Sequence, residues 1–415
     1  MTSNYKKYFV PALFTLVFGS ITLAVEPFRF GDFEVFMEAG KNLAAGKNIY
    51  LSNANGFKYF YSPLFATLLS FLNAFPDIVA VSIWKLFNLV FLLRFWVLLE
   101  KMYIDYTGFS QRQQYIYQFT VFAVSFFLLF SCFHLVQMSV FLLWAVFECL
   151  YQLQVKKRPI PGAAVLAFAI NVKIMPVVIL PYLLYRKQYM ATLYVLVWTV
   201  IFLYLPILFI GFHYNVFLHE EWFKSINPTN AIHVLDLDET GFHSLTSFFA
   251  ALLSEGHGTH WDLDAKRNIA NLDTQTISWI INGARLIFVA YTLRVLATKP
   301  FVTVNDRLQL FREISYILLI TPLIFPHQQV YGFLLALPAL AYCTYAYMLE
   351  KRAGIGINAA KIVFLLAVVI INLELFMGFA RAWLWHYKTL TYGILLLVVA
   401  LVLFSCTAAS PRKSA

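Results

Sequence analysis

Residues 156–187 read KKRPIPGAAVLAFAINVKIMPVVILPYLLYRK, an apolar stretch with a basic cluster at each end. Basic residues beside membrane spans lie mainly on the cytoplasmic side, so the clusters at 156–158 and 186–187 should face the same compartment. The stretch between them must therefore enter the membrane and return. Each half, on either side of Lys173, is too short to cross about 30 Å of hydrocarbon. We expect a hairpin of two short helices whose tip lines a cavity in the protein.

The composition of the whole chain is typical of a membrane protein. Of the 415 residues, 61% are hydrophobic, 18% aromatic and 13% charged, whereas a soluble domain has about 25% charged residues. This balance excludes a soluble enzyme, a nucleic-acid-binding protein and a disulfide-stapled secreted module. In such a chain the basic residues behind the net charge of +10 indicate in the first place which loops face the cytoplasm. The four cysteines, at positions 132, 149, 343 and 406, lack metal or redox spacing and are expected to be small core residues.

Ten further apolar segments are candidate membrane spans, because about 20 helical residues cross the hydrocarbon. They are residues 8–25, 78–101, 114–131, 134–153, 190–211, 277–297, 312–325, 328–348, 360–380 and 389–406. The segment 62–75 is short for a crossing, and the charge rule favours an interfacial helix on the outer side. With the hairpin counted as two passes, we expect an all-α bundle of about 12 transmembrane helices and both termini in the cytoplasm.

This assignment of membrane spans places two long loops, 26–77 and 212–276, on the outer side of a single transmembrane domain of residues 1–415. Residues 26–61 and 212–276 hold 13 of the 21 acidic residues. All nine histidines lie on the outer side or at outer ends of spans. An amphipathic stretch at 241–253 predicts an interfacial helix in the second loop. The polar chemistry of the chain is therefore predicted to face outward.

Asp32 is the first candidate for chemistry. Residues 33–45 are expected to form a short helix that Gly46 ends, and Asp32 stands at its N-terminus. Aspartate commonly caps a helix by accepting hydrogen bonds from the free backbone donors of the first turn. The carboxylate is thus either a cap or a catalytic group. The two roles are compatible, because capping would also fix the direction of the carboxylate.

Lys173 is the second candidate. A lysine within a membrane segment costs about 2.5–3.5 kcal/mol on insertion scales, so it usually has a partner or a water-filled cavity. The ammonium group either snorkels to the outer interface from the hairpin tip or faces an anion. A lipid phosphate of the outer leaflet is the natural anion at this position.

The proline-broken junction at 322–329 is the third candidate. Its two prolines free backbone groups, and His327 and Gln328 could donate hydrogen bonds to an anion. A polar turn at the interface is the alternative interpretation. Gln137 lies at another outer tip, and we expect it to face the same cavity.

The order of these features resembles the integral-membrane glycosyltransferases of the GT-C superfamily, most closely glycosyltransferase family 87, the polyprenol-phosphate-mannose-type mannosyltransferases. The similarity extends over about residues 26–340. The residues that carry it are Asp32, Phe36, Ala39, Gly46, Tyr50, Tyr61, Pro63, Leu64, Gln137, Lys173, Pro176, His243, Ser244, Leu245, Pro322 and His327. The chain departs from the family pattern at Val136, which replaces a glycine. It also lacks the tryptophan and the second histidine of a Pro-x-Ser-Trp-x-His-His motif.

The resemblance implies an inverting transfer of a sugar, a hexose such as mannose, from a polyprenyl-phosphate-sugar donor to a lipid- or glycan-linked acceptor. Asp32 would be the general base beside the acceptor hydroxyl, and cations would stabilise the departing phosphate. The residues that we expect to contact the donor phosphate are Lys173, His327, Gln137 and Gln328. Those that we expect to contact the sugar or acceptor are Glu34, Tyr61, His243 and Ser244.

The expected partners are the donor lipid, the acceptor and membrane lipids, without nucleic acid. The expected location is the cell (inner) membrane, with the active site on the extracytoplasmic side of the cell envelope. The sequence has no nucleotide-binding glycine-rich loop, so no nucleotide donor is implied, and neither a cofactor nor a metal is expected. Two alternatives stay open. A polysaccharide polymerase or ligase would lack the early aspartate followed by an interfacial helix. A secondary transporter would show internal repeats with matching broken helices.

Overall fold

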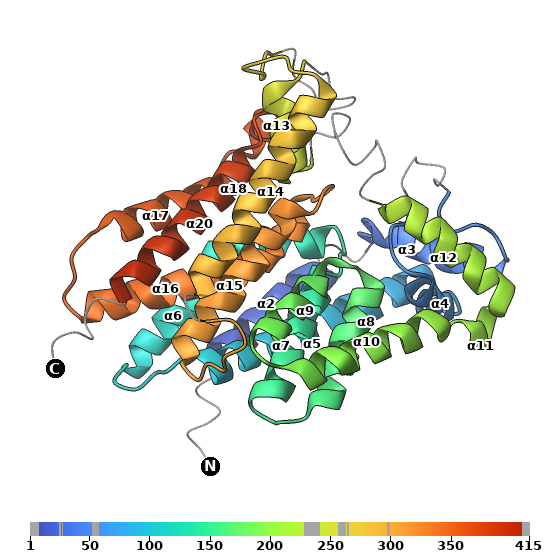
Figure 1. Cartoon of the computed structure of the whole chain (residues 1–415), viewed down its shortest axis with the longest axis horizontal. Helices are drawn as coiled ribbons and strands as arrows, with labels where there is room; N and C mark the ends of the chain where they lie inside the picture. The colour runs from blue at the N-terminus through green and yellow to red at the C-terminus, as the bar shows by residue number, and fades with distance from the viewer. Residues whose placement is uncertain are drawn as a thin grey trace. The chain divides into compact units, whose positions relative to one another are not determined.

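The computed structural model describes residues 8–408 apart from 25, 27, 52–57, 228–240, 256–262, 264, 297 and 298. Within these residues the chain forms α-helices and 3-10 helices and no strand (Figure 1). Phe242 and Gln329 form an isolated antiparallel bridge. The prediction of an all-helical chain is therefore confirmed.

The chain divides into two units, and each is described here by itself. The first comprises Met1–Met102, Cys132–Pro228 and Lys299–Thr303, and the second comprises Tyr103–Ser131, Thr229–Thr298 and Val304–Ala415. Both units are thus assembled from segments that alternate along the sequence.

The helices of the first unit are α2 (Phe9–Ala24), α3 (Phe33–Ala44), α4 (Pro63–Leu72), α5 (Asp77–Tyr103), α7 (Ser139–Gln154), α8 (Pro159–Val172), η1 (Met175–Val178), α9 (Ile179–Tyr185), α10 (Tyr189–Tyr204), α11 (Ile207–Ile210) and α12 (Phe212–Ile226). α8 packs against α7 and α10, and α3 packs against α4. An aromatic cluster fills the core between α3, α4 and α5. Its central ring, Phe36, lies 5.0 Å from Tyr61, 5.5 Å from Phe65 and 6.2 Å from Trp84, measured between ring centroids. This rigid packing supports the segments that carry the candidate site.

The apolar stretch between the two basic clusters consists of short helices, as predicted. α8 ends at Val172, and Lys173 takes an extended conformation with φ −144° and ψ 127°. Pro176 lies in the first turn of η1, where a proline needs no backbone donor. The break therefore falls at Lys173, and it presents this side chain at a helix end.

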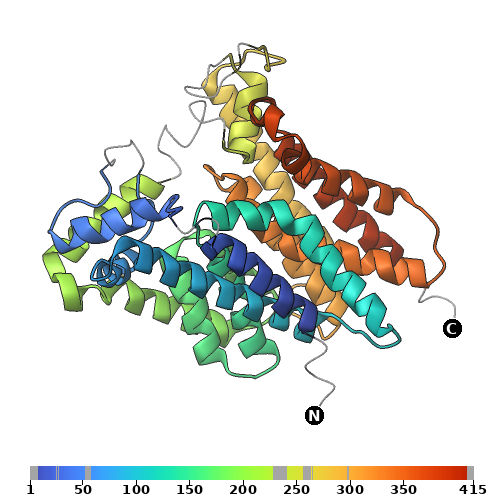
Figure 2. The ribbon, with the colours of Figure 1, turned by 180° about the vertical axis from the view of Figure 1, so that it is seen from behind.

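The helices of the second unit are α6 (Gln111–His134), whose last residues enter the first unit, α13 (Leu245–Leu253), α14 (Thr274–Leu296), α15 (Arg307–Ile324), η3 (Val330–Ala336), α16 (Leu337–Arg352), α17 (Ala359–Ile371), α18 (Leu373–Phe376), η4 (Gly378–Ala380), α19 (Arg381–His386) and α20 (Thr389–Ala408). α17 packs against α20, and α15 packs against α16. The pair α17 and α20 is seen side by side in Figures 1 and 2.

Five helices of the described chain are long and apolar enough to cross a membrane: Asp77–Tyr103, Gln111–His134, Tyr189–Ile210, Thr274–Leu296 and Val330–Arg352. The pair Gly378–His386 and Thr389–Phe404, bent by 76°, would be a sixth if it forms one span. The expected count of twelve is not confirmed, because several expected spans are helices of 10–17 residues.

The expected span at 360–380 shows a physical reason for such a break. Asn372 follows the last residue of α17, and its side chain accepts a hydrogen bond from the backbone of Phe127 and donates one to Val124. A buried amide that forms hydrogen bonds with the backbone of another helix stabilises a helix end inside an apolar run. Helices are present at both positions predicted to be interfacial, as α4 and α13.

Candidate active site

The backbone around Asp32 is fixed by the turn that follows α6. The Asp32 N–H donates to the carbonyl oxygen of Leu135 at 3.1 Å. Gly31 has φ +51°, and a Cβ at this position would lie 2.6 Å from the same carbonyl oxygen. Only glycine combines this conformation with this close approach. Val136 also has a positive φ, 53°, so a tight turn brings the next residue toward Asp32.

The carboxylate of Asp32 accepts a hydrogen bond from Nε2 of Gln137. The amide oxygen of Gln137 accepts one from the hydroxyl of Tyr61 at 3.3 Å. An ionised carboxylate can only accept, so the amide must present its nitrogen to Asp32 and its oxygen to Tyr61. Gln137 is 2% exposed and Tyr61 is 6% exposed. The interior of the first unit therefore fixes both the position and the orientation of the amide.

Asp32 stands at the N-terminus of α3, as predicted, but its side chain makes no capping hydrogen bond. Its carboxylate is directed to Gln137 instead. Burial raises the pKa of the Asp32 carboxyl above its ordinary value, and the hydrogen bond from Gln137 limits this rise. The positive charges of Lys173 and Arg29 also favour the ionised form of Asp32.

Lys173 belongs to the same group of side chains. Its Nζ lies 5.6 Å from the centroid of the Tyr61 ring, a distance at which a cation is attracted by the aromatic face. Four residues predicted from the sequence are thus brought together within the first unit. We call Asp32, Tyr61, Gln137 and Lys173 the Asp32 cluster.

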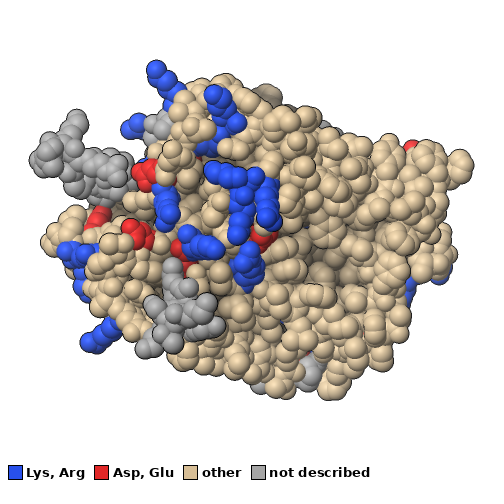
Figure 3. Space-filling model, turned by 90° about the horizontal axis from the view of Figure 1, so that it is seen from below, with Lys and Arg blue, Asp and Glu red and all other residues tan. Residues whose placement is uncertain are grey.

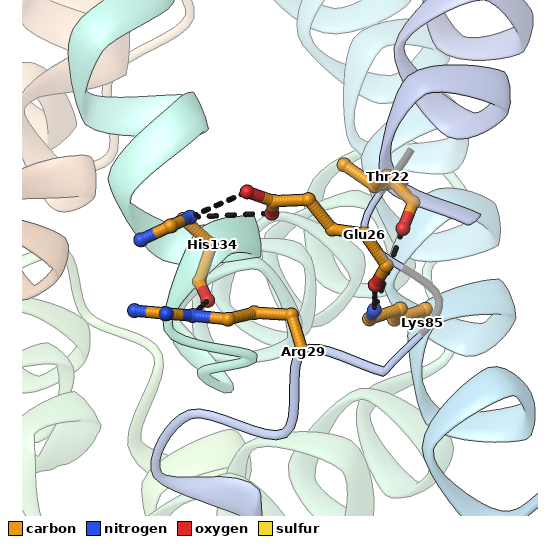
Figure 4. A network of polar contacts seen from close by, with 5 residues as sticks. All are labelled: Thr22, Glu26, Arg29, Lys85 and His134. Atoms are coloured by element: carbon orange, nitrogen blue, oxygen red, sulfur yellow. Dashed lines mark hydrogen bonds and ion pairs between the residues drawn. The ribbon is translucent and has the colours of Figure 1, made fainter. Parts of the chain in front are cut away.

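A second polar network holds the chain segments next to this cluster (Figure 4). Nδ1 of His134 lies 2.9 Å from Oε1 of Glu26, and Arg29 Nε donates to the carbonyl of His134 at 3.4 Å. Lys85 on α5 donates to the carbonyls of Glu26 at 2.6 Å and of Thr22 at 3.4 Å. These contacts connect the end of α2 to α5 and to the end of α6. They stabilise the turn against which Asp32 is placed.

Arg29 and Lys85 were not among the residues singled out from the sequence. The signal for Lys85 was present, because a lysine within the apolar segment 78–101 needs a polar partner. Glu34 was singled out, but it is exposed on α3. Among the described residues, no hydrogen bond or ion pair joins Glu34 to the Asp32 cluster.

The second unit holds the other predicted residues. The backbone N–H of His243 donates to the carbonyl of Gln328 at 2.8 Å, so the segments before α13 and after α15 lie together. His327 has φ 54°, and its ring lies 5.2 Å from that of Phe242. His243 and Ser244 are 1% and 0% exposed.

Both ring nitrogens of His243 and the hydroxyl of Ser244 are buried without a hydrogen-bond partner among the described residues. Burial, together with the charge of Lys388, holds the pKa of His243 well below its ordinary value. Lys388 was not predicted as a site residue, although a lysine directly before the last apolar segment was a signal for it. It is 3% exposed and donates to the carbonyl of Phe242 at 2.9 Å. Buried polar groups of this kind are suited to hold a polar ligand.

The Asp32 cluster can therefore accept a proton and stabilise an anion. A carboxylate held by an amide can act as a general base toward a hydroxyl, and a nearby ammonium group can stabilise developing negative charge.

The family model of glycosyltransferase family 87 matches residues 59–326, more than half of the chain. The match includes Tyr61, Gln137 and Lys173 of the Asp32 cluster, while Asp32 lies before its first residue. No curated protein and no solved structure matches the chain. A helical membrane architecture agrees with the family, whose members transfer sugars. The chain belongs to glycosyltransferase family 87 and is a membrane glycosyltransferase of the GT-C type.

Proposed function

We propose that this enzyme transfers a hexose such as mannose from a polyprenyl-phosphate-sugar donor to a hydroxyl group of a lipid- or glycan-linked acceptor. The transfer inverts the configuration at the anomeric carbon and takes place on the extracytoplasmic side of the cell membrane. Both termini of the chain lie in the cytoplasm. The observation that supports this proposal most directly is the Asp32 cluster, in which a fixed carboxylate lies close to an ammonium group.

Asp32 acts as the general base in this proposal. The acceptor oxygen attacks the anomeric carbon, its proton passes to the Asp32 carboxylate, and the bond between that carbon and the phosphate oxygen breaks. The lipid phosphate leaves from one face of the anomeric carbon and the acceptor oxygen attacks the opposite face, which inverts the configuration. Burial raises the pKa of Asp32 toward the working pH, and this makes the ionised carboxylate a better proton acceptor.

Lys173 stabilises the lipid phosphate as it departs. Negative charge grows on the phosphate when the glycosidic bond breaks, and an ammonium group in a protein interior acts on it more strongly than in water. The donor already carries its leaving group, so the proposal includes neither a cofactor nor a metal. His327 and Gln328 remain our candidates for further phosphate contacts.

His243 and Ser244 are our candidates for contacts to the sugar or the acceptor. Their unpartnered buried polar atoms support this role, because a hydroxyl-rich ligand would supply the missing hydrogen bonds. Tyr61 and Glu34 complete the set predicted for the sugar or acceptor. Among the described residues, the hydroxyl of Tyr61 donates a hydrogen bond to the amide oxygen of Gln137.

The test is sugar transfer from radiolabelled polyprenyl-phosphate sugars into lipids of membranes that contain the enzyme. Wild type should transfer label, and Asp32→Asn should transfer about 10²–10⁴-fold less, the usual loss when a general base is removed. Glu38→Gln is the matched control, since Glu38 is a carboxylate of the same helix for which no hydrogen bond or ion pair is seen within the described chain. Near-normal transfer by Asp32→Asn would overturn the assignment of the base. Absence of transfer by wild type from every lipid-linked sugar would overturn the donor class.

A further inference from the structure

Three basic side chains surround one tyrosine ring at the ends of α5 and α7. Measured to the centroid of the Tyr151 ring, Cζ of Arg94 lies at 5.4 Å, Nζ of Lys101 at 5.1 Å and Nζ of Lys156 at 5.9 Å. All three charges thus lie within 5.9 Å of one point, which is less than the screening length of about 8 Å in physiological salt. We call these four residues the Tyr151 cluster.

The cluster lies where two apolar helices end. Lys101 is in the last turn of α5, and Lys156 follows Val155, the residue that caps α7. Arg94 leaves α5 about two turns, or roughly 10 Å, before Lys101. Its side chain is 42% exposed and reaches toward the helix ends, as basic side chains do at a membrane boundary. Exposed basic side chains are visible on the face of the chain seen in Figure 3.

The positive charge of the Tyr151 cluster is only partly compensated within the described chain. Arg94 is paired with Glu148 through two hydrogen bonds of 3.0 and 3.3 Å. Lys101 donates to the hydroxyl of Tyr151 at 2.9 Å, but neither it nor Lys156 forms an ion pair with any described carboxylate. Glu100, the residue before Lys101, is fully buried. Two ammonium groups beside one ring therefore lack a carboxylate partner among the described residues, and a bound anion would interact favourably with both.

The cluster also offers a neutral donor. The hydroxyl of Tyr151 accepts its hydrogen bond from Lys101, which leaves its own proton to donate. Both ammonium groups lie within 5.9 Å of the centroid of the ring that carries this O–H, and a tetrahedral anion with several oxygens can accept hydrogen bonds from donors of both kinds. A phosphate group has this chemistry.

The lipid-exposed face of α5 indicates that the phosphate belongs to an amphipathic molecule. Phe87, Arg94 and Lys101 are seven residues apart in sequence, so they lie on one face of the helix. Phe87 is 53% exposed and Val90, on the same face, is 63% exposed. This face is therefore apolar toward the middle of α5 and basic at its end. A phospholipid presents the same sequence of apolar and anionic groups.

We propose that the Tyr151 cluster binds the phosphate of an anionic phospholipid whose acyl chains lie along Phe87 and Val90 of α5. The site is made entirely within the first unit. It shares no residue with the Asp32 cluster, so the proposed lipid site does not depend on the proposed reaction.

The experiment measures lipid binding to the purified full-length enzyme in detergent by native mass spectrometry and by its unfolding temperature. The probes are phosphatidylglycerol, phosphatidylcholine and inorganic phosphate. The test variant is Lys101→Gln with Lys156→Gln. The control is Lys157→Gln with Arg158→Gln, which removes the same charge from neighbouring exposed positions outside the Tyr151 cluster.

Phosphatidylglycerol should bind wild type and raise its unfolding temperature, and phosphatidylcholine should do so less. The test variant should bind phosphatidylglycerol roughly 30-fold more weakly, since each lysine near an anionic headgroup contributes a factor of about five. The control should bind like wild type, and Tyr151→Phe should lose a few-fold through the missing O–H.

Two results would overturn the proposal. Equal losses in the test and control variants would mean that phosphatidylglycerol responds to net charge and not to this site. Stabilisation of wild type by inorganic phosphate to the same extent as by phosphatidylglycerol would assign the cluster to a small free anion.

Discussion

Replacement of Tyr61 by phenylalanine tests how the carboxylate of Asp32, the proposed base, is oriented. The change removes one oxygen atom and keeps the ring that lies below Lys173. It leaves the amide oxygen of Gln137, which is 2% exposed, without the hydrogen bond from Tyr61. A neutral hydrogen bond contributes about 1 kcal/mol net, which corresponds to roughly a fivefold change in the ratio of the amide orientation that faces Asp32 to the turned one. We expect kcat to fall, by at most about fivefold.

The pH dependence of the reaction should change in a defined direction. The general base works only when ionised, so activity is present above the pKa of Asp32 and is lost as the pH falls through it. The hydrogen bond from Gln137 lowers this pKa against the effect of burial. Weakening it in Tyr61→Phe raises the pKa further, so the acid limb of kcat should move to higher pH. A turned amide would have the same effect, because its oxygen would face the carboxylate.

Initial rates between about pH 4 and pH 8 measure both quantities. Tyr59→Phe is the matched control, since the Tyr59 hydroxyl donates to the backbone of Ser62 in the same aromatic core and should leave the acid limb in place. The double variant Tyr61→Phe with Gln137→Ala should lose no more than Gln137→Ala alone, because both changes remove one connected interaction. An unmoved acid limb together with a raised KM would refute the reasoning. Tyr61 would then be a substrate ligand and not an orienting residue.

Three further predictions test the base, the cation and the topology. Asp32→Asn should lower transfer about 10²–10⁴-fold and should also change the pH dependence of stability. In wild type the pKa of Asp32 is raised, so the free energy of unfolding falls as the pH rises from the ordinary to the raised pKa, because the folded state holds this proton more tightly than the unfolded state. The unfolding temperature of Asp32→Asn should lack this fall. Parallel curves of unfolding temperature against pH for the two proteins would contradict the prediction. Lys173→Met should lower transfer by roughly 10²–10³-fold and weaken donor binding, while Lys173→Arg keeps part of both; unchanged donor affinity in Lys173→Met would show that the lysine only snorkels. A cysteine introduced at the exposed Lys266 should be labelled from outside intact cells and one at Lys157 should not, and the reverse pattern would refute the assignment of membrane spans.

Much of the local structure could be predicted because its causes are local. The helix expected at 33–45 is observed at Phe33–Ala44, and the break expected near Lys173 and Pro176 is observed there. Apolar runs, prolines and glycines determine such features within a few residues of sequence. The number of membrane spans could be predicted less well from the sequence. Asn372 interrupts an apolar run through contacts with residues about 245 positions away, and no local pattern reports them.

The partners of the site residues could not be predicted for the same reason. Gln137 is 105 residues from Asp32 and 76 residues from Tyr61 in the sequence. The sequence singled out all three residues, but it assigned Gln137 to the donor phosphate. The observed hydrogen bonds indicate a different role, in which the amide orients the carboxylate of the proposed base. Such a role depends on three-dimensional distances that residue type alone does not determine.

The position of Asp32 shows where local and tertiary preferences compete. A side-chain cap at the N-terminus of a helix contributes about 1 kcal/mol, and Asp32 forgoes it in favour of Gln137. Burial makes its ionised form still less favourable. A folded chain keeps such an arrangement when the rest of the structure enforces it, as Gly31 and the turn at Leu135 do here. A residue that fits its local motif yet does not use it is expected at a functional site, and this is a reason to regard Asp32 as the base that is independent of the family resemblance.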